Sequence, residues 1–248
     1  MRFPNNNTLT IHSLESFGIH DGPGIRFVIF LQACNMRCIY CHNPDTIQIH
    51  GGTVVSIESL VERAERMKPY FADKGGVTVS GGEPMLQAKA LVHFFELLSQ
   101  KNIHTNIDTN GTIRSEASHI LLSECADLVM FDIKATTHKK FLDITGTNKL
   151  DALLVNIALR EAAKKPYWLR YVLIPGITDS AQSFQWLIDS FRHARYLERV
   201  EILPYHTLGV QKWKSLGMKY ALEGVNPPTD ESIQQIKTLL RSYFQHVP

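Results

Sequence analysis

Residues 25–43 read IRFVIFLQACNMRCIYCHN, an apolar run followed at once by a cluster of cysteines. The run at 25–32 is short and rich in branched and aromatic residues, as is typical of a strand that is buried on both faces. Five similar runs follow along the chain, at 77–80, 104–108, 127–133, 167–174 and 200–203. Stretches with apolar residues at helical spacing lie between the runs, at 56–67, 87–100, 114–122, 151–165 and 181–194.

This alternation of strands and helices predicts the fold class. Repeated strand–helix order favours an α/β protein with a parallel sheet and outer helices. About six units are too few to close an eight-stranded barrel, so we expect a partial (β/α)6 barrel of the TIM type, with a doubly wound sheet as the alternative. No linker or repeat divides the sequence, so residues 1–248 are expected to form one domain. Residues beyond Gly209 would add a short helical cover that ends in the amphipathic stretch 229–244.

The composition excludes several classes of protein. Of the 248 residues, 44% are apolar and 20% are charged, which indicates a globular chain rather than a disordered one. The net charge of +2 is too small for a nucleic-acid-binding footprint. No apolar run approaches the roughly 18 residues of a membrane span, and the polar first ten residues contain no recognisable signal peptide. We therefore expect a cytoplasmic protein with neither nucleic acid nor membrane as partner.

The four cysteines indicate a metal or redox site. Cys34, Cys38 and Cys41 lie within eight residues, whereas Cys125 stands alone and is expected to be a small buried residue. Clustered thiols in a chain of this size indicate metal ligands or redox groups rather than disulfides. Structural zinc needs a fourth ligand, and His42 is awkwardly adjacent to Cys41, while a thiol redox pair has no need of Cys34. Three thiolates on a four-iron cluster would leave one iron open. The spacing favours iron–sulfur and leaves zinc open.

The cysteine motif and the polar residues at the strand ends carry a resemblance to a known family. C-x-x-x-C-x-x-C after a first strand resembles the radical S-adenosylmethionine superfamily, and within it the chain is similar to the activating enzymes of glycyl-radical enzymes. The similarity runs from about Ile11 to the C-terminus. The stretches that carry it are ESFGIHDGPGIRFVIFLQACNMRCIYCHNPDT (15–46), GGVTVSGGEPMLQ (75–87), DTNG (108–111), DLVMFDIK (127–134), RYVLIPG (170–176) and LPYHTLG (203–209).

The resemblance implies an activity and a set of site residues. Cys34, Cys38 and Cys41 would ligate a [4Fe–4S] cluster whose open iron binds S-adenosylmethionine. One electron from a reductant such as flavodoxin would cleave this cofactor to a 5′-deoxyadenosyl radical. That radical would take a hydrogen atom from a glycine of the partner, pyruvate formate-lyase, with no catalytic residue beyond cluster and cofactor. The cofactor contacts implied are Tyr40, His42, Gly82, Glu83, Asp132, Ile133, Lys134 and His206. Asp21 is implied to contact the partner.

A small cation is a further hypothesis. Asp108 and Asp132 end neighbouring strands, and two carboxylates so placed repel each other unless a cation or a proton intervenes. The ligands would be Asp108, Thr109, the Met130 carbonyl and Asp132. Alternatively, the two carboxylates cap helices or meet Lys134.

Two other functions remain open at this point. One is a radical enzyme of the same superfamily that acts on a small molecule. The other is a zinc-stabilised binding module without chemistry, which would contain zinc and no iron. Local structural roles also compete with the site roles, since residues 80–83 could form a simple strand-to-helix turn and a lone histidine such as His206 is more often structural.

Overall fold

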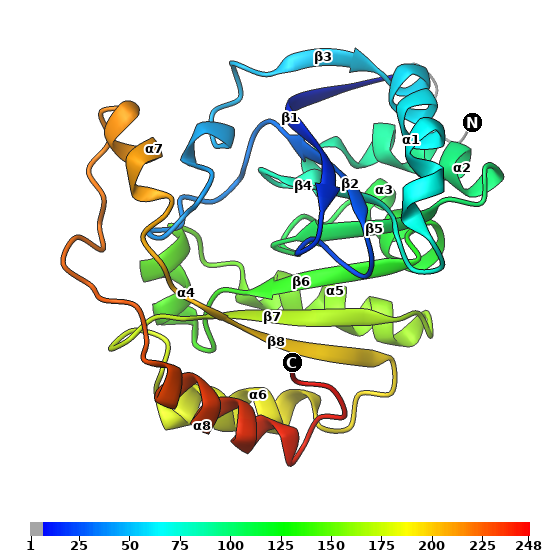
Figure 1. Cartoon of the computed structure of the whole chain (residues 1–248). Coiled ribbons are helices and arrows are strands. Elements are labelled where there is room, and N and C mark those ends of the chain that lie inside the picture. Colours follow the sequence, from blue (N-terminus) through cyan, green and yellow to red (C-terminus); the bar gives the residue numbers. More distant parts are fainter. Residues whose placement is uncertain (1–6) are drawn as a thin grey trace.

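The computed structural model of the chain describes residues 7–248 (Figure 1). The first six residues, on which the expectation about a signal peptide partly rests, lie outside the described residues. Eight strands form one sheet in the order β3-β1-β2-β4-β5-β6-β7-β8. Their bounds are β1 Thr8–Gly18, β2 Arg26–Leu31, β3 Thr53–Ser56, β4 Gly76–Gly81, β5 His104–Thr109, β6 Leu128–Ile133, β7 Tyr167–Leu173 and β8 Leu197–Pro204.

The six predicted strands form the parallel part of this sheet. Strands β2, β4, β5, β6, β7 and β8 pair in parallel with their neighbours in chain order. A doubly wound sheet would reverse its strand order partway across, and this sheet does not. Across the described residues β3 and β8 remain at opposite edges, so the barrel is not closed. The predicted partial (β/α)6 barrel is therefore confirmed.

Two antiparallel strands extend the sheet beyond the prediction. Strand β1 pairs antiparallel with both β2 and β3. Its sequence, TLTIHSLESFG, alternates at the start, where Leu9 and Ile11 are buried between more exposed neighbours. That alternation is typical of a half-buried strand. No strand was predicted here from the sequence, because the alternation covers only a few residues and follows a polar, Asn-rich start.

Most helices cover the outer face of the sheet, whereas α7 lies away from it, beside the loop between β2 and β3 (Figure 1). The helices are α1 Ile57–Phe71, α2 Ala88–Gln100, α3 Glu116–Ile120, α4 His138–Thr145, α5 Leu150–Ala162, α6 Ala181–Phe191, α7 Val210–Ser215 and α8 Asp230–Arg241. The predicted Ser56 cap is present, with its hydroxyl accepting from the Ser59 amide at 3.2 Å. The predicted helix at 114–122 begins later, at Glu116, and continues as a π-helical turn, Leu121–Cys125. The short helix α4 was not predicted, whereas α7 and α8 form the helical cover expected beyond Gly209.

Strand register decides which polar side chains meet inside the barrel. Asp132 of β6 pairs with Arg170 of β7, and Arg170 pairs with Glu201 of β8. Residues in register on neighbouring strands point to the same face of a sheet, so these three side chains form one row on the inner face. The bulky apolar side chains of α2, such as Phe94 and Phe95, are fully buried on the outer face. Within residues 7–248, no helix has the length and apolar character needed to cross a membrane.

Candidate active site

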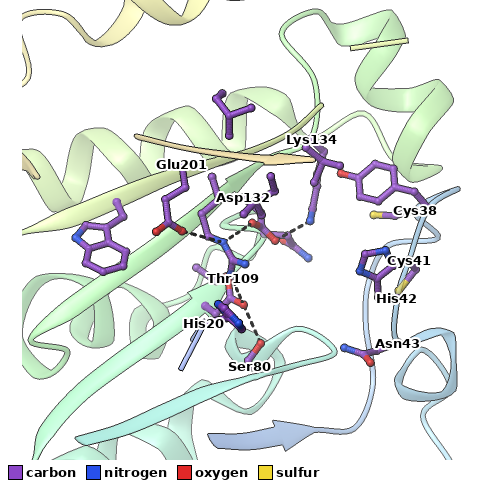
Figure 2. Close-up of a pocket in the computed structure, with 18 of the residues that line it drawn as sticks. His20, Cys38, Cys41, His42, Asn43, Ser80, Thr109, Asp132, Lys134 and Glu201 are labelled. Carbon is purple, nitrogen blue, oxygen red and sulfur yellow. Dashed lines mark hydrogen bonds and ion pairs between the residues drawn. The ribbon is translucent and has the colours of Figure 1, made fainter. Parts of the chain in front are cut away.

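One cavity gathers most of the predicted site residues. It has a volume of about 640 Å³ and lies at the carboxyl ends of the parallel strands. The predicted residues that line it are Cys34, Cys38, Tyr40, Cys41, His42, Gly82, Asp108, Thr109, Asp132, Lys134 and His206. Figure 2 shows the thiols of Cys38 and Cys41 on one side and the charged groups of Asp132 and Glu201 on the other. The strand-end pattern therefore predicted which residues lie together, because parallel strands bring these ends to one edge.

The cysteine loop, residues 32–48, is held by main-chain hydrogen bonds from both sides. The Arg37 amide donates to the carbonyl of Thr145, the last residue of α4, at 2.8 Å. On the other flank the indole of Trp213 in α7 donates to the Cys41 carbonyl at 2.8 Å. Helices α4 and α7 thus fix the loop that carries the three thiols.

The three thiols fit a cationic metal centre better than a free state. They form no disulfide, Cys38 is buried, and Cys34 and Cys41 are half-buried. Burial raises the pKa of Cys34 to about 11 and that of Cys38 to about 12, so neither is a thiolate without a compensating positive charge. Among the described residues, no three His, Cys, Asp or Glu side chains are grouped to hold a single metal ion. The single-ion zinc alternative therefore gains no support from the geometry, whereas an iron–sulfur cluster is a larger group that such thiols can surround.

A neutral hydrogen-bond network ties this loop to the ends of β4 and β5. The Asn110 amide side chain donates to Asn35 Oδ1 at 2.9 Å, and Asn35 donates to Thr112 at 2.8 Å. The Asn110 main-chain amide in turn donates to Glu83 Oε2 at 2.8 Å, and the Thr109 hydroxyl donates to Glu83 Oε1 at 2.6 Å. Sequence reasoning missed this framework, because nothing in the spacing pairs Asn35 with Asn110.

Glu83 belongs to that framework rather than to the cavity wall. Its side chain is fully buried and does not line the cavity. Burial raises its pKa to about 7, although the hydrogen bonds from Thr109, Met85 and Asn110 lower it. Only the Glu83 main chain could reach a ligand, while neighbouring Gly82 lines the cavity directly. A Cβ atom on Gly82 would stand 2.0 Å from the Ala33 carbonyl oxygen, so only glycine fits there.

A row of buried charges forms the opposite wall. Lys134 meets Asp132 at 2.7 Å, and Arg170 meets Asp108 at 2.9 Å and Glu201 at 3.7 Å. Burial would raise the pKa of Asp132, but Lys134 and Arg170 together hold it below its ordinary value. For Asp108 burial outweighs Arg170 and raises the pKa to about 6.

Arg170 and Glu201 were not predicted as site residues. Each is a charged residue inside an otherwise apolar strand, in YWLRYVL and in VEILP. A buried charge is rare without a partner, so that placement was a usable signal. Trp168 and Arg199 also line the cavity, and they were not singled out from the sequence.

The carboxylates proposed as cation ligands, Asp108 and Asp132, are paired with basic side chains in the structure. Arg170 and Lys134 already compensate Asp108 and Asp132, which removes the repulsion on which the hypothesis was based. The Thr109 hydroxyl donates to Glu83, and the Met130 side chain packs in a small apolar cluster with Leu128 and Trp168. The cation stays a prediction, since Asp108 Oδ1 is buried without a hydrogen-bond partner among the described residues.

Five residues that line the cavity have a buried polar atom without a hydrogen-bond partner within the part of the chain that the structure describes. These atoms are Tyr40 Oη, Asp108 Oδ1, Arg170 Nε, Arg199 Nε and His206 Nδ1. His206 stacks on His42 with ring centroids 4.1 Å apart. A native protein leaves few buried polar groups unpaired, so these atoms indicate a polar bound molecule.

Two further predicted residues lie off the cavity. Ile133 is 1% exposed in the apolar core, so its main chain alone could contact a ligand. The Asp21 carbonyl accepts from Thr78 at 2.6 Å, and its neighbours His20 and Gly22 line the cavity while Asp21 does not.

Comparison with known proteins places this site in a family. Residues 28–187 match the model of the radical SAM superfamily. The pyruvate formate-lyase-activating enzyme of Staphylococcus epidermidis is 42% identical over 91% of this chain and 92% of its own. The pyruvate formate-lyase 1-activating enzyme of Escherichia coli K12 is 41% identical over 96% and 97%.

Solved structures agree on the fold. SuiB of Streptococcus suis bound to its precursor peptide SuiA matches 94% of this chain and 49% of its own, with a TM-score of 0.69 and 14% identity. A domain of pyruvate-formate lyase-activating enzyme from Bacteroides vulgatus covers 70% of this chain and 99% of its own, with a TM-score of 0.58 and 24% identity. The match to the family model and the identity to the sequence relatives show that the chain belongs to the radical SAM superfamily. Within it, the chain belongs to the family of pyruvate formate-lyase-activating enzymes, which generate radicals.

Proposed function

We propose that this chain activates pyruvate formate-lyase by generating a glycyl radical on it. The observation that carries the proposal is that three clustered thiols share one cavity with five buried polar atoms that have no hydrogen-bond partner among the described residues. The thiol end of the cavity suits a [4Fe–4S] cluster held by Cys34, Cys38 and Cys41. Its volume of about 640 Å³ is in the range of cofactor sites, and Trp168 and Arg199 also line it.

A cluster held by the three cysteines would supply the one-electron reduction that cleaves S-adenosylmethionine to methionine and a 5′-deoxyadenosyl radical, and this radical would take a hydrogen atom from the partner's glycine. The chain's own residues bind and orient. Lys134 can meet the cofactor carboxylate because its ammonium group stays charged: burial opposes the charge, but Asp132 raises the pKa of Lys134 well above its usual value. Tyr40 Oη and His206 Nδ1 can each bond to polar groups of the cofactor.

The same residues shield the site from water. Tyr40 is 5% exposed, and the ammonium group of Lys134 lies 5.7 Å from the centre of its ring. Trp213, 6% exposed, covers the loop behind Cys41. Excluding water protects a reactive radical from side reactions. Asp21 stays a proposed partner contact, since it lies beside two cavity-lining residues.

Three broader points belong to the proposal. Residues 1–248 would act as one radical S-adenosylmethionine domain. The electron would come from a one-electron carrier such as flavodoxin. The protein would work in the cytoplasm, where reducing conditions keep clustered thiols available for a cluster.

An anaerobic assay tests this function. The reconstituted protein is mixed with S-adenosylmethionine, a reductant and pyruvate formate-lyase, and the glycyl radical is measured by electron paramagnetic resonance. We expect a radical signal that disappears when the radical-bearing glycine of the partner is changed to alanine. An intact cluster that cleaves S-adenosylmethionine without producing this signal would contradict the proposal in favour of a small-molecule substrate. Zinc without iron would favour the binding module.

A further inference from the structure

We propose that a basic surface beside the cysteine loop is the docking site for an acidic, one-electron carrier protein. This surface, named here the basic collar, consists of residues 137–149, which include α4, and residues 207–219, which include α7. The inference rests on the proposed function, because only a redox centre at Cys34, Cys38 and Cys41 requires an electron donor.

The basic collar lies on both sides of the thiol-bearing loop. Figure 1 shows the loop between β2 and β3 passing between α7 and α4. The Arg37 amide bonds to Thr145 in one half of the collar, and Trp213 in the other half bonds to the Cys41 carbonyl. The Arg37 side chain, between Cys34 and Cys38, is exposed and does not line the cavity. A protein seated on the collar would therefore approach the thiols from the solvent side of the loop and leave the cavity free.

The collar concentrates positive charge in a nearly neutral chain. It holds six lysines and one acidic residue, Asp143, which gives a net charge of +5. The whole chain carries +2, so the remaining residues carry −3. Lys139 has 86% of its side chain exposed, and Lys149, Lys214 and Lys219 are also exposed. A local excess of one sign attracts an oppositely charged protein and raises its association rate.

Exposed leucines give the collar an apolar component. Leu142 is 47% exposed, Leu208 82% and Leu216 47%. Protein interfaces combine an apolar centre with a polar rim, and electron-transfer encounters are among the smallest of them. An electron carrier needs only a brief approach to the thiols, whereas the glycyl-radical enzyme has to insert a peptide into the cavity. The charge and position of the collar therefore favour the carrier.

Charge reversal tests the collar. The variant K139E/K214E changes one exposed lysine in each half, and R66E/K89E is the matched control with the same change in net charge on α1 and α2. Both are reconstituted anaerobically, and cluster reduction is followed by absorbance without pyruvate formate-lyase. One arm uses reduced flavodoxin at low salt, and the other uses a photoreduced deazaflavin. We expect K139E/K214E to slow reduction by flavodoxin at least tenfold and to leave the photochemical reduction unchanged.

The outcomes are distinguishable. The tenfold difference should shrink in high salt, because screening weakens exposed charges, and R66E/K89E should remain near the wild-type rate. Equal slowing in both variants, or in neither, overturns the inference. So does normal reduction by flavodoxin combined with loss of the glycyl radical, which would assign the collar to pyruvate formate-lyase. Failure of the proposed function itself would appear earlier, as a wild-type protein without a photoreducible cluster.

Discussion

The two walls of the cavity are built on different principles. On the cysteine-loop side, Asn35, Asn110 and Glu83 bond to one another and to neighbouring main chain. On the side of β5 and β6, Arg170 and Lys134 balance carboxylates, and Asp108 Oδ1 stays without a hydrogen-bond partner among the described residues. The first wall holds the cysteine loop in place, although Tyr40 Oη of the same loop is buried without a hydrogen-bond partner among the described residues. The second wall carries the charged groups, and we expect it to receive the charged part of a ligand.

Removing one thiol should have the largest effect on this arrangement. Cys38 is the most buried of the three, and a cluster that loses one of three protein ligands has no replacement beside it. We expect Cys38→Ala to lose most of its bound iron and all detectable glycyl-radical formation, as measured by iron analysis and electron paramagnetic resonance. Cys125→Ala is the matched control and should retain both. Full iron content in Cys38→Ala would show that the cysteine loop is not the cluster site.

Lys134 offers the next largest effect, on the ligand-receiving wall. Lys134→Met leaves the Asp132 carboxylate with Arg170, 3.9 Å away, in place of its 2.7 Å partner. Breaking one side of a fully buried pair costs about 3–5 kcal/mol of folding stability, and we expect less here because the two side chains are 13% and 21% exposed. The loss of a charge-assisted bond to the cofactor should raise the S-adenosylmethionine dissociation constant about 10–100-fold, as measured by calorimetry.

A double variant separates the two roles of Lys134. Lys134→Met/Asp132→Asn removes the unpaired carboxylate and should recover most of the stability without recovering cofactor affinity. If affinity returns together with stability, Lys134 acts only through Asp132 and does not contact the cofactor.

The sequence predicted the residues of the charged wall better than those of the wall formed by the hydrogen-bond network of Asn35, Asn110 and Glu83, called here the neutral wall. Residues that end strands, such as Asp108, Asp132 and Lys134, were predicted, because parallel strands carry their carboxyl ends to one edge. The neutral framework was not, since Glu83 looks like a ligand until its partners are visible. Its three hydrogen bonds join residues that are two to 27 positions apart.

The fold shows the same contrast between local pattern and tertiary pairing. Apolar runs predicted the six parallel strands. Strand β1 was not predicted, because its only signal is an alternation of apolar and polar residues over a few positions. Arg170 was missed because its compensation comes from three carboxylates on other strands, and no local pattern encodes which strands are neighbours.

Glu83 provides a pH test of the neutral wall. The folded-state pKa is about 7, mainly because of burial, and the ordinary value is 4.5. Between these values the folded state binds a proton that the unfolded state has released, so this group's contribution to stability falls as pH rises from about 4.5 to 7. The total change is on the order of 3 kcal/mol. Glu83→Gln cannot titrate and should have a shallower slope of unfolding free energy against pH.

Denaturant unfolding at several pH values measures that slope. Glu62→Gln, at an exposed position on α1, removes the same charge and should keep the wild-type slope. Identical slopes in wild type and Glu83→Gln would mean that Glu83 remains ionised throughout, held by its three hydrogen-bond donors.

The smallest effect is expected where the neutral wall meets the cysteine loop. Asn35→Ala removes the bonds to Asn110 and Thr112, each worth about 0.5–1.5 kcal/mol, so the unfolding free energy should fall by about 1–2 kcal/mol. Because Asn35 lies between Cys34 and Cys38, the looser loop should also lose iron faster to a chelator. Asn148→Ala, at an exposed position, should change stability by less than about 0.5 kcal/mol and leave iron loss unaltered. Asn35→Ala could lower stability but leave the rate of iron loss unchanged. In that case the network supports the fold without holding the cysteine loop, and the role that we assign to the first wall is wrong.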